Sequence, residues 1–203
     1  MMLKKAKLAV AGGVTLVTVV GVTAGTALIA ATAAYASIGP DQTVTGSLAP
    51  GTDMTFSGDI DGISITVSCK NFSATGKTSK KPATKFKLSA PPTVNGCTDS
   101  LGGTDTIVTK GKWSFSVNSA GTEVTLTIPK KGATFTSSVE SGCTITAAPK
   151  KSNPVTGSYN DSSGTVTVSN ASIATSGSGC SSGPATTNAT VVLSPNPGAP
   201  PWG

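Results

Sequence analysis

The chain has 203 residues and a formal charge of +6, and all fifteen of its basic residues are lysines. Without arginine it lacks the bidentate fork that reads phosphates and guanine edges, so sequence-specific nucleic-acid binding is not expected. The sequence also has no histidine, which excludes Ser-His-Asp and Cys-His catalysis and histidine-bearing metal sites.

The first 36 residues have the order of a secretory signal peptide. Three lysines between positions 4 and 7 precede an apolar run over 8–29, and Ala34-Tyr35-Ala36 gives a small-x-small cleavage pattern. We therefore expect a signal-peptide helix that is cleaved after Ala36, which would lower the formal charge from +6 to +3. The alternative is an uncleaved membrane anchor, because a run of about 20 residues can span a bilayer.

From residue 43 onward, short alternating segments are separated by Gly, Pro, Asn and Ser, which is typical of strands and turns. The pair 113–117 and 124–128, joined by a turn at 118–121, predicts a β-hairpin. Strands are predicted over 43–48, 54–57, 62–70, 83–89, 106–108, 113–117, 124–128, 135–139, 143–146, 165–169 and 190–193.

The stretch from Cys143 to Cys180 contains two of these segments, 143–146 and 165–169, and a turn signal at 159–164. We interpret it as antiparallel strands joined at their ends by a disulfide. No stretch of useful length has apolar residues at helical spacing, and turn signals recur every 8–12 residues. The sequence therefore predicts an all-β fold, an antiparallel β-sandwich (immunoglobulin-like or related), with a small β-barrel as the alternative.

Residues 37–194 are expected to form the single β domain, and residues 195–203 a flexible tail rich in proline. Trp113 begins a strand and is expected in the core, whereas Trp202 in the tail is expected to be exposed.

Four cysteines follow the predicted signal peptide, and an even number in that context indicates a disulfide framework. There is no C-x-x-C spacing for zinc. Three connectivities are possible, and we favour the one in which each bridge closes a local loop, Cys69–Cys97 with Cys143–Cys180.

Several motifs resemble small secreted proteins that are common in actinobacteria. They are T-V-S-C ending at Cys69, G-C-T-I-T around Cys143, G-S-Y-N-D-S-S-G-T-V-T-V over 157–168, and S-G-C ending at Cys180. The resemblance covers roughly 63–195 and implies an exported β-rich fold with a Cys143–Cys180 bridge. Those proteins often carry Gly-Cys-Leu-Gly-Leu after the last cysteine, where this chain has Ser-Ser-Gly-Pro. The resemblance implies no activity.

The groups left for catalysis are carboxylates, lysines and hydroxyls. A hydrolase of the glycosidase type would need two carboxylates about 5–10 Å apart. The candidate pairs are Asp59 with Asp61 and Glu123 with Glu140. The motif at 59–62 also resembles the start of a calcium loop but lacks its closing glutamate, so a hairpin turn is the preferred interpretation. No catalytic, cofactor-binding or metal residue is assigned.

The strongest charge feature is a run of five lysines without an acid between them: Lys77, Lys80, Lys81, Lys85 and Lys87. Such a run fits contact with an anionic envelope polymer or membrane surface. The alternative is an edge strand whose lysines oppose aggregation. Three further pairs are interpreted as solvated turn charges: Lys110 with Lys112, Lys130 with Lys131, and Lys150 with Lys151.

Together these features predict an exported, non-enzymatic protein, extracellular or associated with the cell envelope, with a binding or structural role. The alternatives are a small secreted hydrolase that uses carboxylates and a secreted inhibitor. The expected partners are an anionic envelope polymer or another extracellular protein, with membrane contact only through an uncleaved signal segment.

Overall fold

The structure is a computed structural model that describes residues 42–78 and 85–195. The predicted signal peptide and residues 196–203 lie outside these ranges. The regular elements within them are fourteen β-strands, which confirms the all-β prediction. They are β1 (Thr43–Leu48), β2 (Met54–Ile60), β3 (Ile63–Lys77), β4 (Lys85–Leu88), β5 (Thr93–Asp99), β6 (Thr104–Thr109), β7 (Ser114–Val117), β8 (Glu123–Ile128), β9 (Ala133–Ser137), β10 (Thr144–Ala147), β11 (Asn153–Asn160), β12 (Thr165–Ile173), β13 (Thr175–Ser178) and β14 (Ala185–Pro195).

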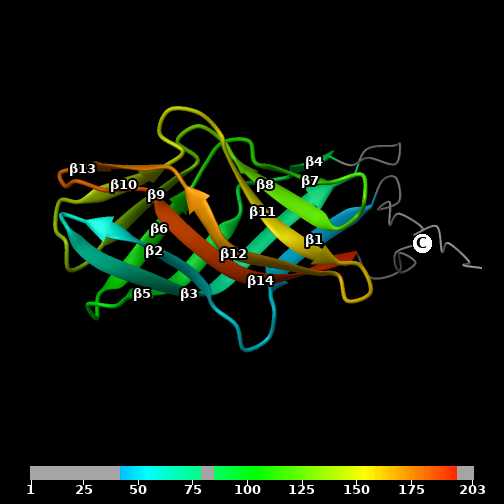
Figure 1. Cartoon of the computed structure of the whole chain (residues 1–203), viewed down its shortest axis with the longest axis horizontal. Helices are drawn as coiled ribbons and strands as arrows, with labels where there is room; N and C mark the ends of the chain where they lie inside the picture. Colours follow the sequence, from blue (N-terminus) through cyan, green and yellow to red (C-terminus); the bar gives the residue numbers. More distant parts are fainter. Residues whose placement is uncertain (1–41, 79–84, 196–203) are drawn as a thin grey trace, which may run out of the picture. The chain divides into compact units, whose positions relative to one another are not determined.

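Eight of the strands close into an antiparallel β-barrel (Figure 1). The ring runs β1-β14-β12-β11-β8-β7-β4-β3, and β3 returns to β1 through the register Thr43↔Lys77 to Ser47↔Ser73. Closure removes the free edges that an open sheet would present to other chains. Of the two all-β arrangements expected from the sequence, the structure therefore has the alternative, the barrel.

The other six strands form an extension of the barrel wall. β3 is 15 residues long, and its first half runs past the ring, where it pairs with β2 and β5. From β5 the sheet continues through β6, β9 and β10 to β13, while the other edge of β2 pairs with β14. An isolated bridge between Ile60 and Ser182 joins the far end of β2 to the segment that follows β13. The extension therefore also curls around an interior.

The predicted turns explain the local geometry of the hairpins. Asp61 and Gly62 both have positive φ, 49° and 79°, as the primed turn of a two-residue hairpin requires, and they join β2 to β3. The predicted β7–β8 hairpin is also confirmed. There the Asn118 side-chain oxygen accepts a hydrogen bond from the Thr122 N–H at 2.9 Å.

Alternation of inward apolar and outward polar residues builds the core. In β3, Ile65, Val67 and Cys69 are all buried and belong to the main cluster of the interior. A smaller cluster is built from Trp113, Ile128, Ala148, Val155 and Ile173. The Trp113 indole N–H donates to the backbone carbonyl of Lys110 at 2.9 Å, and Trp113 is buried as predicted.

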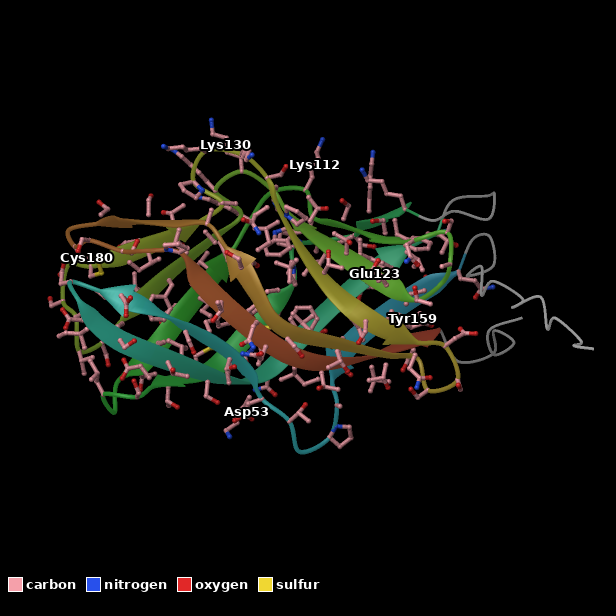
Figure 2. The ribbon with its side chains drawn as sticks, in the orientation of Figure 1. Asp53, Lys112, Glu123, Lys130, Tyr159 and Cys180 are labelled. Carbon is pink, nitrogen blue, oxygen red and sulfur yellow. A yellow bond between two sulfur atoms is a disulfide. The ribbon has the colours of Figure 1, made fainter. Side chains whose placement is uncertain are left out.

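Both favoured disulfides are confirmed. Cys69–Cys97 joins β3 to β5 between residues that face each other in register. The barrel and its extension together are called the β unit. Cys143–Cys180 joins the residue before β10 to the turn after β13, at one end of this unit (Figure 2). Two disulfides indicate an oxidising environment. Within the described ranges, no helix is long and apolar enough to cross a membrane.

One prediction about the 143–180 stretch is wrong. Its two predicted strands do not pair with each other, because β10 lies between β9 and β13 and β12 lies between β11 and β14. The turn near 161–164 joins β12 instead to β11, a strand that the sequence analysis missed together with β5 and β13.

Candidate functional site

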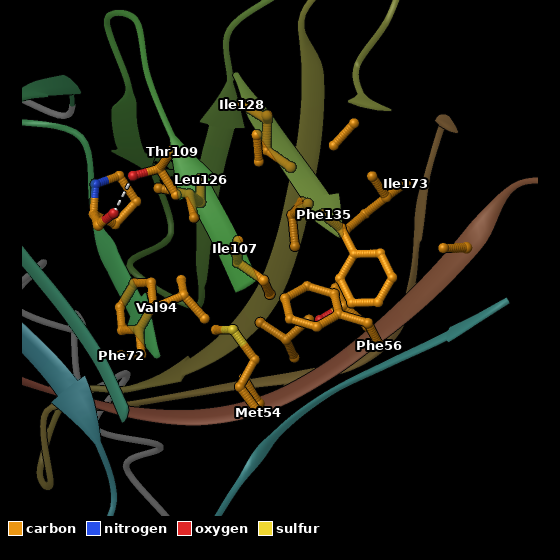
Figure 3. Close-up of a pocket in the computed structure, with 18 of the residues that line it drawn as sticks. Met54, Phe56, Phe72, Val94, Ile107, Thr109, Leu126, Ile128, Phe135 and Ile173 are labelled. Atoms are coloured by element: carbon orange, nitrogen blue, oxygen red, sulfur yellow. Dashed lines mark hydrogen bonds between the residues drawn. The ribbon is translucent and has the colours of Figure 1, made fainter. Parts of the chain in front are cut away.

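The interior of the β unit contains an apolar cavity of about 220 Å³ (Figure 3). Inward-facing side chains from the extension meet there, among them Phe56 on β2, Ile107 on β6 and Phe135 on β9. Leu126 and Ile128 on β8 contribute from the barrel. The cavity therefore arises where the barrel and its extension share one interior.

Local sequence accounts for the unfilled space. In β6 every second residue turns inward, so Ile107 and Thr109 line the cavity while Val108 is 54% exposed. Small alanines occupy lining positions on two neighbouring strands, Ala133 on β9 and Ala147 on β10, which face each other in register. Short side chains at facing positions leave space that larger residues would occupy.

Three of the hydroxyl groups in the lining are engaged by the protein itself. Thr109 donates to the Pro92 carbonyl, Thr175 donates to the Gly183 carbonyl, and Thr187 donates to the Thr55 carbonyl at 3.0 Å. Among the described residues, the Ser182 Oγ atom is a buried lining oxygen without a hydrogen-bond partner. The cavity can therefore hold a ligand mainly through hydrocarbon contacts.

A pair of buried carboxyl groups lies on the β5–β6 hairpin, and the sequence analysis missed it. Asp99, 8% exposed, accepts hydrogen bonds from the Leu101 and Gly103 N–H groups at 2.9 and 2.8 Å and from the Ser137 hydroxyl at 2.8 Å. Burial raises the pKa of Asp99, but these donors outweigh it and hold the pKa below its usual value.

Asp105 has the opposite environment. It is 5% exposed, and within the described chain neither of its carboxyl oxygens has a hydrogen-bond partner. A carboxylate only accepts, so Asp105 can bond to the Asp99 carboxylate only when it carries a proton. Burial and the neighbouring Asp99 charge raise the pKa of Asp105 to about 6. In T-D-T-I-V-T, Asp105 is in phase with the inward Ile107, and this alternation was the signal available in the sequence.

The first candidate carboxylate pair flanks the β2–β3 turn, as expected for a hairpin. Asp59 accepts a hydrogen bond from the Ser64 hydroxyl at 2.9 Å. Asp61 accepts from the Ser181 N–H at 2.7 Å and from its hydroxyl at 2.8 Å, and these bonds lower the pKa of Asp61. Asp61 thus fastens the end of β2 to the segment after β13.

The second candidate pair is not brought together. Glu123 begins β8 and lies at the opposite end of the β unit from Cys180 (Figure 2). Glu140 is three residues from Cys143, which is bonded to Cys180. Across the described part of the chain, no three Asp, Glu, Cys or His side chains gather as a metal site would require.

The lysine run is placed only in part, because Lys80 and Lys81 lie outside the described residues. Lys77 ends β3 opposite Lys87 of β4, and both are exposed, as is Lys85. The edge-strand interpretation is wrong, because β4 pairs with β3 on one side and with β7 on the other. Protection of a free edge therefore does not explain Lys77, Lys85 and Lys87.

The fold and cavity define a small closed β-barrel with an apolar interior. No family model, curated protein or solved structure matches the chain.

Proposed function

We propose that this is an exported, non-enzymatic binding protein that holds an apolar small molecule, or the hydrocarbon part of a larger one, inside its barrel. The observation that carries the proposal is the cavity of about 220 Å³ lined by hydrocarbon side chains. Interiors normally pack to the density of organic crystals, so a void of this size has a cost in lost contacts that a ligand would recover.

The chemistry of the lining defines the ligand class. An apolar cavity of about 150 Å³ in another protein stays dry and binds benzene, so this larger space can take a ring of that size or the end of an acyl chain. Binding would come from burial of apolar surface, at about 25 cal/mol per Å² before the costs of association. The lining threonines with internal partners offer little to a charged ligand.

Two observations support export and the absence of enzymatic activity. The two disulfides agree with an oxidising compartment, which the predicted signal peptide would reach, with a mature chain that begins at Ser37. The candidate carboxylates do not form a catalytic pair. Glu123 lies at the opposite end of the β unit from Cys180, near which the Cys143–Cys180 disulfide holds the segment of Glu140, and Asp61 is held by Ser181. The arrangement of these carboxylates therefore favours a binding protein over a hydrolase.

Two substitutions on neighbouring residues test the cavity. Ile107→Phe adds volume to the lining, whereas Val108→Phe adds the same ring to the outer face of the same strand. Titration with N-phenyl-1-naphthylamine, an uncharged apolar fluorophore, should show saturable enhancement with the natural chain. We expect about tenfold weaker binding for Ile107→Phe and no change for Val108→Phe.

Ala133→Leu is a second variant that adds volume to the cavity lining, and it keeps the test valid if Ile107→Phe does not fold. Circular dichroism should show that both variants are folded. Folded filling variants that bind the dye as well as the natural chain would contradict the proposal. So would a natural chain without saturable binding.

A further inference from the structure

Three turns that are about twenty residues apart in sequence lie side by side in the fold. They join β6 to β7, β8 to β9 and β10 to β11, and each carries two lysines. We call the set the lysine crown: Lys110, Lys112, Lys130, Lys131, Lys150 and Lys151.

Backbone hydrogen bonds link the three turns. The Lys110 N–H donates to the Gly132 carbonyl at 2.8 Å, and the Lys131 N–H donates to the Ala148 carbonyl, also at 2.8 Å. In the strands below, Ala133 faces Thr109 on one side and Ala147 on the other. The sheet thus gathers six charges that the sequence presents as three separate pairs.

All six lysines are exposed, and their three turns contain no acidic residue. The ion pair found among the described residues is Lys70–Asp53, at 2.7 Å. Asp53 projects on the opposite side of the β unit from Lys112 and Lys130 (Figure 2). The crown is therefore a concentrated positive surface without local compensation, and it borders Lys87, which faces Ser114 on β7.

The crown lies above one end of the apolar cavity. Thr109 and Trp113 line the cavity and directly flank the first lysine turn. Ile128 and Ala133 line it on either side of the second turn, and Ala147 lines it just before the third. The ends of these strands thus place lysines on the outer surface and apolar side chains in the cavity.

We propose that the lysine crown docks the protein onto the surface of an anionic lipid bilayer, with which the cavity exchanges its apolar ligand. This inference rests on the proposed function, because an apolar ligand resides in lipid rather than in water. Lysines act as point charges that need no matched partner geometry, which suits a diffuse layer of phosphate headgroups. Each lysine near such a surface strengthens binding about fivefold, and salt weakens the attraction.

The test measures cosedimentation with vesicles of phosphatidylcholine that contain about one third phosphatidylglycerol. The variant Lys112→Gln/Lys130→Gln/Lys150→Gln removes one charge from each turn and should bind about 100-fold more weakly. The matched variant with Arg at the same three positions keeps the charge and should bind like the natural chain. Lys131 is left unchanged because its φ of 54° is strained for most side chains.

Lys70→Gln removes one charge from the opposite side and should leave vesicle binding unchanged. The natural chain should lose binding on vesicles of phosphatidylcholine alone and at high salt. Full binding by the Gln variant would overturn the proposal. Equal binding to neutral vesicles would do the same, as would binding to soluble polyphosphate without binding to vesicles.

The dye titration separates this inference from the proposed function. The Gln variant should bind N-phenyl-1-naphthylamine as the natural chain does, because its substitutions lie outside the cavity. If the natural chain binds vesicles through the crown but no dye, the cavity proposal fails and docking remains. If it binds dye but not vesicles, docking fails alone.

Discussion

Two neighbouring aspartates show how local partners decide the state of a buried carboxyl group. Asp99 is surrounded by three donors and is held as a carboxylate. Asp105 on the paired strand does not receive the Leu101 and Gly103 N–H groups, and besides being buried it faces the negative charge of Asp99. A proton on Asp105 both removes its buried charge and gives Asp99 a further hydrogen bond.

This arrangement predicts a stability that falls as pH rises. The pKa of Asp105 is about 6 in the folded chain, above the ordinary aspartate value of 3.8, so the folded state binds more protons between these values. The contribution of Asp105 to the free energy of unfolding is fully present below about pH 4. It is lost as the pH rises through 6, and the loss amounts to at most about 3 kcal/mol. Asp99 acts in the other direction and only at lower pH, because its pKa is depressed.

The variant Asp105→Asn tests this directly, because an amide stays neutral and can still donate to Asp99. At pH 8 it should raise the urea midpoint above that of the natural chain, and near pH 4 the difference should vanish. Asp161→Asn, in the exposed β11–β12 turn, is the control and should produce no such pH-dependent gain. An equal midpoint difference at both pH values would contradict the buried-charge explanation.

At the residue scale the sequence was informative where one residue type has few possible roles. The cysteines allowed three pairings, and closure of local loops selected the observed one. Trp113 at a strand start was correctly placed in the core. Asp105 was missed although it is in phase with the inward-facing Ile107. Its Ser137 neighbour on β9 could not be expected because that pairing crosses 32 residues.

At the scale of elements, β13 depends most on its covalent anchor. It is four residues long and contains no large apolar side chain, and among the described strands it pairs only with β10. Cys180 follows it and is bonded to Cys143 in front of β10, so the disulfide clamps the open end of this pair. Asp61 fastens the next residue, Ser181, to the β2–β3 turn.

Replacing Cys143 and Cys180 together with serine should lower the denaturant midpoint and leave the β signature in circular dichroism. The bridge has a sequence separation of 37, and closing such a loop stabilises by about 3–4 kcal/mol in the chain-entropy model. A domain of this size is stable by about 5–15 kcal/mol, so the effect is measurable. The natural chain under mild reduction is the comparison, and an unchanged midpoint in the double variant would count against the clamp.

The strands that the sequence analysis missed share one property, the lack of a clear apolar alternation. β13 reads T-S-G-S, β11 contains Pro154 and Gly157, and β5 is interrupted by Gly96 with a φ of 65°. Their backbones are held by neighbours that are distant in sequence rather than by an apolar face of their own. The predicted pairing within 143–180 was wrong for this reason. The sequence indicated β10 and β12, but it did not indicate their actual partners, β13 and β11.

At the scale of the whole molecule, the barrel could not be told from a sandwich by pattern alone. Both architectures alternate inward and outward residues along every strand. The difference lies in closure, in which β1 pairs with β14 about 150 residues away, as in Thr45↔Ser194, and also with β3. The cavity and the lysine crown depend on the same long-range register, so neither was predictable from the sequence.

The mature chain expected after cleavage retains all fourteen described strands. Cleavage after Ala36 would leave six residues before β1, and the first described backbone N–H, that of Gln42, donates to the Thr78 hydroxyl at 2.7 Å. The pairings of β1 with β14 and with β3 that close the barrel thus lie among residues that cleavage would leave in place.

In a secreting bacterial host, protein recovered from the medium should begin at Ser37 and have the mass of a chain with two disulfides. Bulky residues in place of the small ones at the cleavage site should block processing, so Ala34→Phe/Ala36→Phe should accumulate in the membrane fraction. The control Tyr35→Phe, at the tolerant middle position, should be processed normally. Natural chain that retains Met1 in the medium would contradict cleavage after Ala36. Natural chain that stays in the membrane like the blocked variant would show that the amino-terminal segment is an anchor.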